Sequence, residues 1–304
     1  MKNQVVYRNV PILAMATNDW AGPWMNRQQL LSRLAKRGWR VVYSTGALSF
    51  WDRDKPHWKA AHWQGDAYRD QAVQVDRPGR WLPRWPSHRW WDNIAIRHHA
   101  NRLLQTFGCK PGDDFILYVF DPGFWPYLPY LRPRWVVFHI RDAYWEMPGW
   151  TEQMEREIAQ LVARADLLVA SSEGMAKSLP EPGSRKAKVL HNGADAAAFK
   201  AGETAPCPPE ISRIKRPRLG YIGRITSKVN PFLILEVVKH RPEWQWVFVG
   251  PFGNDGKGGF GDDRDAAAGW RQCQNLSNVH LLGYRPHTEL PAYVNHMDVN
   301  TMCY

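Results

Sequence analysis

Two cations follow a short apolar segment in the second half of the chain, at a spacing suited to binding phosphate groups. Residues 219–223 indicate a buried strand, and Arg224 and Lys228 come just beyond it. A guanidinium can hold a phosphate through two parallel hydrogen bonds, and an ammonium adds a compact positive charge. We therefore predict that Gly223, Arg224 and Lys228 bind a diphosphate. An ordinary surface loop with two basic residues explains the same pattern equally well.

A histidine and an aspartate mark the end of another apolar segment, residues 135–140. His139 falls inside this segment and Asp142 comes just after it. The structural explanations of this pattern are a core histidine and an aspartate that caps the following turn.

Several other patterns indicate no chemistry of their own. Residues 256–261 match G-x-G-x-x-G, but the preceding strand ends near Gly250 and Asp262 and Asp263 follow. That context favours a surface loop over a dinucleotide site. The histidines lack acidic partners at zinc spacing, which predicts no protein-bound metal. The cysteines lie far apart, which indicates free thiols in a reducing cytoplasm. The residues concerned are His57, His62, His88, His98, His99, Cys109, Cys207, Cys273 and Cys303.

The elements that would position these residues alternate between strands and helices in two series. In the first series, strands are expected at 10–16, 39–44, 115–120, 134–140, 166–170 and 187–190, and helices around 30–35 and at 92–106, 151–164 and 173–179. In the second, strands are expected at 218–223, 245–250, 278–282 and 297–303, and helices at 231–240, 263–274 and 288–295. Residues 51–91 show no clear period, and the Pro-rich stretch 200–217 indicates a linker.

This alternation predicts an α/β protein with two Rossmann-like domains. We place the first at residues 1–205 and the second at 206–304. Parallel sheets bind ligands at the carboxyl ends of their strands, so a cleft between two such sheets is the expected binding site.

The composition is strongly basic and rich in tryptophan, with a formal net charge of +11 and 17 Trp residues. A basic surface attracts nucleic acid, anionic lipid or phosphorylated substrates. Residues 80–93 interleave cations with Trp, which fits a membrane interface, a surface that stacks on sugars, or a platform for single-stranded nucleic acid. A packed loop with its rings in the core is the structural alternative. No apolar run approaches the roughly 18 residues that a membrane span needs.

Five stretches, in this order along the chain, resemble GT-B glycosyltransferases of the retaining family 4 type, in branches that make bacterial surface polysaccharides or exopolysaccharides. They are ADLLVASSEGM (165–175), KVLHNGADAAAF (188–199), LGYIGRITSK (219–228), WVFVGP (246–251) and NVHLLGYRPHTELPAYVNHMDV (278–299). The resemblance covers nearly the whole chain, best from about residue 134 onward. It departs from the family at Lys228, which many members place one residue later, and at Gly22, where many have a glycine pair.

The resemblance implies a nucleoside-diphosphate sugar as donor and a glycan or lipid-linked acceptor. Arg224 and Lys228 would neutralise the leaving diphosphate, and His139 and Asp142 would orient the sugar. Other expected cleft residues are Asn18 and Gly22 in the first loop, with Glu173 and Asn192. No tightly bound cofactor, metal or nucleic acid is expected. The expected location is the cytoplasm, with peripheral attachment to the inner face of the membrane. The resemblance also favours contact with a membrane or an acceptor as the function of residues 80–93.

Members of this family continue beyond the Asp298-Val299 dipeptide into a segment that supplies a carboxylate for the donor sugar. We therefore expect the second domain to be truncated and this chain to be catalytically incomplete. The alternative to an enzyme is a fragment or remnant that binds glycan or nucleotide without transferring a sugar. A nucleotide-sugar oxidoreductase is a third possibility.

Overall fold

A computed structural model describes residues 10–146, 149–254 and 258–303 of the chain. Contacts divide the chain into two compact units, Met1–Gly193 and Ala194–Tyr304, and each is described by itself. The division falls earlier than the boundary expected after residue 205. The reason is helix α8 (Ala196–Gly202), which packs on α12 (Leu290–Asn295) of the second unit. There the Asn295 side-chain amide donates a 3.0 Å hydrogen bond to the Phe199 carbonyl.

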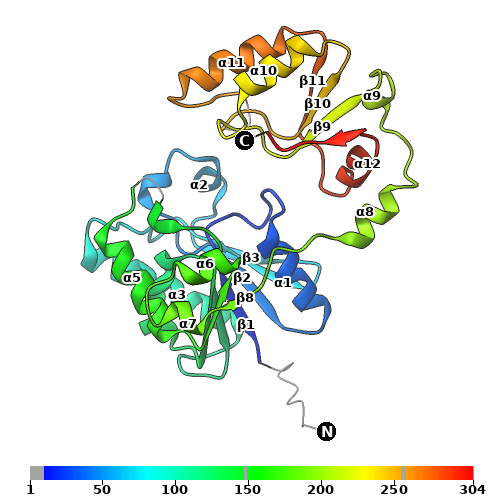
Figure 1. Cartoon of the computed structure of the whole chain (residues 1–304). Coiled ribbons are helices and arrows are strands. Elements are labelled where there is room, and N and C mark those ends of the chain that lie inside the picture. Colours follow the sequence, from blue (N-terminus) through cyan, green and yellow to red (C-terminus); the bar gives the residue numbers. More distant parts are fainter. Residues whose placement is uncertain (1–9, 147–148, 255–257, 304) are drawn as a thin grey trace. The chain divides into compact units, whose positions relative to one another are not determined.

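The first unit is built on an eight-stranded sheet in the order β3-β4-β2-β1-β5-β6-β7-β8 (Figure 1). Its strands are β1 (Ile12–Met15), β2 (Val41–Ser44), β3 (Gly65–Asp70), β4 (Val73–Pro78), β5 (Ile116–Val119), β6 (Trp135–Ile140), β7 (Leu167–Ala170) and β8 (Lys188–Val189). All neighbouring pairs are parallel except β3 and β4, which are antiparallel. Because the central strands are parallel, their carboxyl ends share one edge of the sheet.

Helices cover both faces of this sheet, which is why its central strands are continuous apolar runs. Alternate residues of β1 divide between two cores: Ile12 packs with the helix that carries Leu31, and Leu13 packs with the helix that carries Ile96. The longer helices are α1 (Asn26–Lys36), α3 (Arg89–Phe107) and α5 (Glu152–Arg164), and the shorter ones are α2 (Pro56–Ala60), α4 (Leu128–Leu131), α6 (Glu173–Lys177) and α7 (Gly183–Lys186). Short 3-10 turns lie at Phe50–Asp52, Pro122–Tyr127 and Tyr144–Glu146.

The region without a clear period contains a β-hairpin. Strands β3 and β4 pair from Gly65 opposite Pro78 to Asp70 opposite Val73, and Gln71 adopts a positive φ of 51° in the turn. Strand β3 forms the edge of the sheet and reads GDAYRD, so it has no apolar run to reveal it. The tryptophans predicted at a surface are not buried in the core: Trp81 is 58% and Trp90 65% exposed.

The second unit is a four-stranded parallel sheet in the order β11-β10-β9-β12. Its elements are β9 (Arg218–Ile222), α10 (Pro231–His240), β10 (Gln245–Val249), α11 (Arg264–Gln274), β11 (Val279–Gly283), α12 and β12 (Val299–Asn300), preceded by α9 (Pro209–Ser212). On one face, Phe248 packs with α11 residue Trp270, and on the other, Val247 packs with α12 residue Tyr293. The expected linker 200–217 therefore holds the end of α8 and all of α9.

Candidate functional site

The carboxyl ends of β9 and β10 are joined by a ladder of backbone hydrogen bonds that continues into their loops. The Gly223 amide donates to the Val249 carbonyl and the Ile225 amide to the Pro251 carbonyl, each at 2.9 Å. Gly250 has a φ of +148°, and a side chain at this position would collide with the Gly223 carbonyl. This close approach fixes the backbone from which Arg224 extends.

Arg224 and Lys228 both lie exposed beyond β9, as the sequence predicts. The Arg224 guanidinium donates from Nη2 to the Asn254 carbonyl at 2.6 Å, and the Asn254 side chain accepts from the Ser227 amide at 3.1 Å. The Lys228 ammonium has no ion-pair partner within the described part of the chain. Two cations with unused N–H groups at one strand end are suited to a diphosphate, and that ligand stays a prediction.

Two residues of the expected GxGxxG loop, Gly256 and Lys257, lie outside the described residues. The described remainder of the loop is anchored by Phe260, which is 4% exposed and meets Phe252 edge to face at a centroid distance of 5.4 Å. This contact belongs to the apolar core of the second unit.

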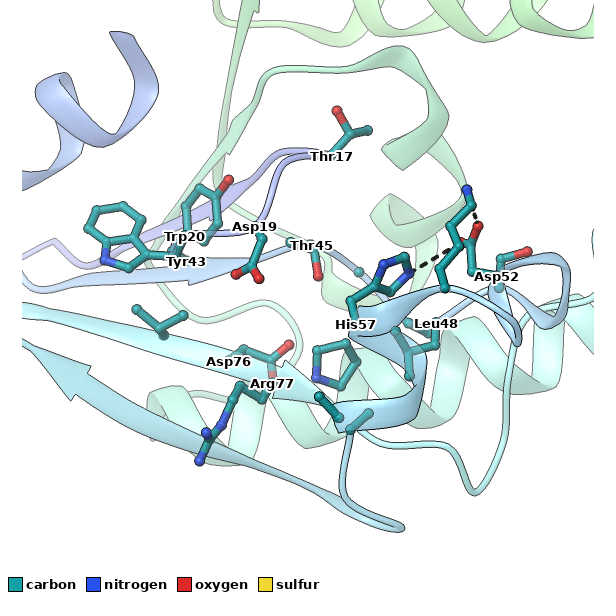
Figure 2. A pocket seen from close by; sticks show the side chains of 18 of the residues that line it. Thr17, Asp19, Trp20, Tyr43, Thr45, Leu48, Asp52, His57, Asp76 and Arg77 are labelled. Carbon is teal, nitrogen blue, oxygen red and sulfur yellow. Dashed lines mark ion pairs between the residues drawn. The ribbon is translucent and has the colours of Figure 1, made fainter. Parts of the chain in front are cut away.

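A pocket of about 550 Å³ opens in the first unit at the carboxyl ends of β1, β2 and β4 (Figure 2). The Asp19 carboxylate reaches it from the first loop, and Trp20 lies beside Tyr43 with ring centroids 4.9 Å apart and ring planes tilted by 59°. Charged groups also come from α2 and the turn before it: Asp52 pairs with Lys55 at 2.6 Å and lies 3.7 Å from His57. Carboxylates beside aromatic rings in a concave site are the groups that bind sugars or other polar ligands.

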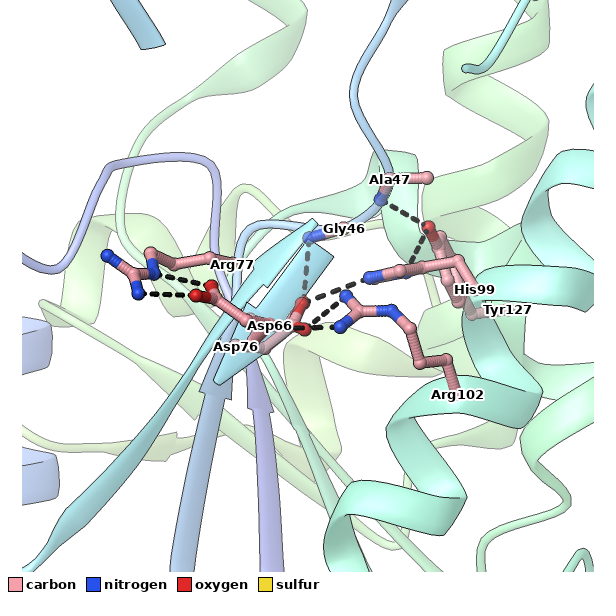
Figure 3. A network of polar contacts seen from close by, with 9 residues as sticks. Gly46, Ala47, Asp66, Asp76, Arg77, His99, Arg102 and Tyr127 are labelled. Carbon is pink, nitrogen blue, oxygen red and sulfur yellow. Dashed lines mark hydrogen bonds and ion pairs between the residues drawn. The ribbon is translucent and has the colours of Figure 1, made fainter. Parts of the chain in front are cut away.

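A buried polar network supports the base of this pocket (Figure 3). The Asp76 carboxylate accepts from the Ser44 hydroxyl at 2.7 Å, lies 3.0 Å from His99 Nε2 and bonds the Arg102 guanidinium. Burial opposes ionisation of Asp76, but the charges and hydrogen bonds of these partners outweigh it, so its pKa lies below the ordinary value. The Ser44 hydroxyl in turn accepts from the Gly46 amide at 3.0 Å, which positions the loop that lines the pocket.

The same network holds the next residue of that loop. The Tyr127 hydroxyl lies 3.1 Å from His99 Nδ1 and accepts from the Ala47 amide at 2.7 Å. Burial raises the pKa of Tyr127 to about 12, so the phenol keeps its proton at neutral pH. The network therefore connects α3 to the pocket loop through hydrogen bonds that are buried or partly buried.

The expected first-loop residues flank this pocket. The Tyr43 hydroxyl contacts the Asn18 backbone oxygen and lies 3.2 Å from its Oδ1. The Gly22 amide donates to the Asp19 carbonyl at 3.1 Å, closing a tight turn. The pocket itself is lined by the residues between them, Asp19, Trp20 and Ala21.

His139 is a buried residue of β6, only 5% exposed. Its Nδ1 lies 3.1 Å from the Tyr118 hydroxyl, and its Nε2 is buried without a hydrogen-bond partner in the described structure. Burial, reinforced by the positive charges of Arg141 and Arg27, lowers the pKa of His139 to about 4. The imidazole is therefore neutral at physiological pH. Asp142 lies just beyond the strand with its side chain 48% exposed, 3.6 Å from Arg141 Nη2.

The remaining expected residues, Glu173 and Asn192, both lie at this edge of the first sheet, each with a partner of its own. Glu173, at the start of α6, lies 3.3 Å from His191 Nε2. Asn192 accepts a 2.8 Å hydrogen bond from Asn26 at the start of α1. Among the described residues, no group of three or more His, Cys, Asp or Glu side chains is arranged to hold a metal ion.

Sequence reasoning missed the pocket residues Asp52 and His57 because they lie in the region without a period. It also missed Arg27 and Arg141, whose positions in a helix and after a strand resemble those of ordinary surface arginines. The sequence offered one sign that Arg141 belongs to the site, because it lies between the expected site residues His139 and Asp142.

Comparisons with known proteins give a fold and one sequence relative. No family model matches the chain. It is 25% identical over 227 residues to TuaH of Bacillus subtilis (strain 168), which is named as a glycosyltransferase of teichuronic acid biosynthesis. The match covers 70% of this chain and 54% of TuaH, so the chain matches about half the length of that relative.

Solved structures resemble nearly the whole chain. A sucrose-phosphate synthase from Thermosynechococcus elongatus matches with a TM-score of 0.64 at 16% identity, over 96% of this chain and 74% of that one. HepE of Anabaena, solved with UDP and glucose, matches with a TM-score of 0.62 at 15% identity, over 96% and 73%. A UDP-N-acetylglucosamine 2-epimerase from Listeria monocytogenes gives 0.53 at 9% identity, over 96% and 73%. With its two α/β units, built on mainly parallel sheets, the chain has the fold of the GT-B glycosyltransferases.

Proposed function

We propose that this chain is a glycosyltransferase that moves a sugar from a nucleoside-diphosphate sugar to a glycan or lipid-linked acceptor in polysaccharide biosynthesis. The observation that carries the proposal is the pair of exposed cations, Arg224 and Lys228, beyond the first strand of the second unit. The sequence match to a teichuronic acid glycosyltransferase and the fold shared with the UDP-bound HepE support it.

In this mechanism the second unit binds the donor. Breaking the bond between the sugar and the diphosphate leaves negative charge on the departing oxygen. Arg224 and Lys228 neutralise that charge, and fixed cations of this kind stabilise the transition state more than the ground state. The Asn254 carbonyl holds one guanidinium nitrogen in place, so part of the ordering cost is met before the donor binds.

The first unit contributes polar contacts to the reacting sugars. His139 is neutral and offers Nε2, which no described residue satisfies. Asp142 offers a half-exposed carboxylate. We assign both residues a positioning role. The family resemblance implies that the configuration of the sugar is retained, and retaining members of the family have no agreed carboxylate nucleophile. The pocket lined by Asp19, Trp20 and Tyr43 is the proposed acceptor site, and its volume of about 550 Å³ suits a sugar unit.

Peripheral attachment to an anionic membrane is part of this proposal. In the described part of the chain, no helix is long and apolar enough to cross a bilayer. Trp63 and Trp81 meet edge to face at 5.5 Å while each stays 58% exposed, and Trp90 is 65% exposed. Exposed indole rings on a basic protein are suited to the headgroup region, where the ring is buried and its N–H remains hydrated.

The donor site is tested by measuring binding of UDP and a panel of nucleotide sugars to the purified chain. Arg224→Ala and Lys228→Ala should each weaken binding by about 1.5–3 kcal/mol for the charged hydrogen bond removed. Lys239→Ala, which removes an exposed cation at the end of α10, should leave affinity unchanged. Unchanged affinity in a folded double variant would place the diphosphate elsewhere.

The reaction class needs a separate measurement, because the same fold occurs in an epimerase. The chain is incubated with a donor that binds, with and without glycan or lipid-linked acceptors, and the products are separated. Release of nucleoside diphosphate together with a lengthened acceptor supports transfer. Appearance of an epimerised sugar without acceptor would replace the proposal by an epimerase.

A further inference from the structure

Two arginine side chains, one buried and one mostly buried, lie at the carboxyl edge of the first sheet. Arg27 lies in the first turn of α1 and is 5% exposed. Arg141 comes directly after β6, with a side chain 10% exposed. Burial, and after it the positive charge of Arg141, lower the pKa of Arg27. Arginine is rarely buried without a partner.

Three hydrogen-bonding groups of these arginines have no partner among the described residues, although Arg141 also bonds the Tyr144 side chain. Nε and Nη1 of Arg27 and Nε of Arg141 are buried without a hydrogen-bond partner. No described carboxylate lies within 4 Å of the Arg27 guanidinium. The ion-pair partner of Arg141 is Asp142, at 3.6 Å, and the carboxylate of Asp142 is half exposed. The Arg27 charge is therefore buried, with no carboxylate partner in the described part of the chain.

The other polar groups around the pair do not neutralise it by contact. Asp121, after β5, is a nearby, partly buried acid, and it accepts from the Gly123 amide at 2.9 Å rather than forming an ion pair with either guanidinium among the described residues. Burial raises the pKa of Asp121, and the charges of Arg141 and Arg27 offset this only in part. Tyr43 and Tyr144 also face the pair, and burial raises the pKa of both phenols, so they carry no charge.

An oxyanion would satisfy this arrangement. An uncompensated buried ion is unfavourable, and this cost is offset when a phosphate or carboxylate binds between the N–H groups of the two guanidiniums. His139 supplies a further donor in the tautomer where the Tyr118 hydroxyl donates to Nδ1, because the ring proton is then on Nε2. The start of α1 adds its own positive end, and Met25 at the N-cap has no side-chain oxygen to satisfy the first-turn amides.

We propose that Arg27, Arg141 and His139 form a binding site for an oxyanion, a phosphate or a carboxylate, carried by the acceptor substrate. The assignment to the acceptor rests on the proposed function, in which the diphosphate of the donor has its own cations, Arg224 and Lys228. The loop that lines the acceptor pocket comes just before α1, the helix that carries Arg27. Gln28 in the first turn of α1 donates to the Asp19 carbonyl at 3.3 Å, and Asp19 lines the pocket.

The test compares three probes by calorimetry and thermal shift at constant ionic strength: inorganic phosphate, glucuronate and UDP. For phosphate and glucuronate, the full chain carries the double substitution Arg224→Ala and Lys228→Ala. Anion binding at the donor site then does not contribute to the signal. Arg27→Met should weaken binding of phosphate or glucuronate by roughly 10- to 100-fold, as expected for a lost charged hydrogen bond. It should also abolish the rise in melting temperature that the anion produces.

The matched control is Arg37→Met, which removes an exposed arginine at the other end of α1 and should bind both anions like the parent. Arg27→Met should fold, because it removes a buried charge without leaving an opposite charge behind. Arg141→Met provides a second variant, since its partner Asp142 is half exposed. Equal responses of the parent, Arg27→Met and Arg141→Met to both anions would overturn the site.

The UDP arm separates this site from the donor site. With the Arg224 and Lys228 side chains intact, UDP affinity should be the same in Arg27→Met as in the parent. Loss of UDP binding in Arg27→Met, with phosphate and glucuronate unaffected, would overturn the assignment to the acceptor. Absence of UDP binding by the parent would count against the donor site, and the two anion arms would still decide the oxyanion site.

Discussion

A Cβ atom at residue 250 would lie 1.9 Å from the carbonyl oxygen of Gly223. Real Cβ atoms essentially never come within 3.0 Å of another heavy atom, so only glycine allows β9 and β10 to approach at this point. The φ of +148° at Gly250 has the same consequence, because L-residues rarely adopt it. The close approach fixes the loop that carries Arg224, so a backbone requirement and a proposed binding site coincide.

Gly250→Ala should therefore destabilise the second unit and weaken donor binding. Forcing a side chain into this backbone region costs about 1–3 kcal/mol, and the collision with Gly223 adds to it. The free energy of unfolding is measured by urea titration and UDP affinity by calorimetry. Gly223→Ala is the control for stability, since its Cβ would lie 3.4 Å from the nearest atom, an ordinary contact. Equal stability of the two variants would contradict the steric argument.

The sequence predicted those parts of the fold that depend on buried apolar runs. Strands β5 and β6 could be located because parallel strands covered on both faces are apolar throughout. The hairpin β3–β4 could not, because β3 is a polar edge strand. The strand end at Gly223 was found from its glycine and the two cations that follow.

The site residues that were missed depend on contacts between distant segments. Nothing in the sequence around Arg27 distinguishes it from an exposed helical arginine, because its burial follows from the packing of α1 on the first sheet. Likewise, Asp76 is one acid among many until Arg102 and His99 are brought to it from α3. The pattern of apolar residues predicts helices and strands, whereas the partners of polar side chains can be identified only from the tertiary structure.

Asp76→Asn should destabilise the first unit by about 3–5 kcal/mol, the usual cost of removing one partner of a buried ion pair. The carboxylate is buried, and its loss leaves the Arg102 charge without its partner. Because Ser44 and Gly46 depend on it, the pocket loop should also loosen and acceptor affinity should fall. Chemical denaturation measures the first effect and acceptor titration the second.

The matched control for this variant is Asp66→Asn in the same hairpin. Asp66 pairs with Arg77 at 2.6 Å, but the Arg77 side chain is 52% exposed, so the change should cost at most about 1 kcal/mol. A similar loss of stability in both variants would show that burial of Asp76 does not determine its contribution.

The stability of the first unit should fall as the pH drops from about 6.5 to about 4, through the titration of His139. The folded-state pKa is lowered to about 4 from an ordinary value of 6.5, so the unfolded chain binds the proton first. The contribution of neutral His139 to the free energy of unfolding is fully present above pH 6.5. It decreases as the pH falls towards 4, by about 3 kcal/mol in total. His139→Gln should flatten this part of the profile, whereas His287→Gln, at an exposed site, should not. A profile unchanged by His139→Gln would contradict the assignment.

Exposed tryptophans should bind anionic vesicles through the edge of the first unit. Trp63 and Trp81 are each 58% exposed and contact one another, so together they can insert into the headgroup region. The net charge of +11 adds a salt-dependent attraction of about 1 kcal/mol for each cation close to the surface. Sedimentation with vesicles should therefore be stronger for anionic than for neutral lipid at low salt, and should weaken as salt is added.

Replacing both Trp63 and Trp81 by Ser should reduce vesicle binding at all salt concentrations. The control is Trp51→Ser, which changes an equally exposed ring outside this pair. Equal sedimentation with the two lipids would contradict the electrostatic contribution, and unchanged binding by the double variant would contradict insertion of these rings.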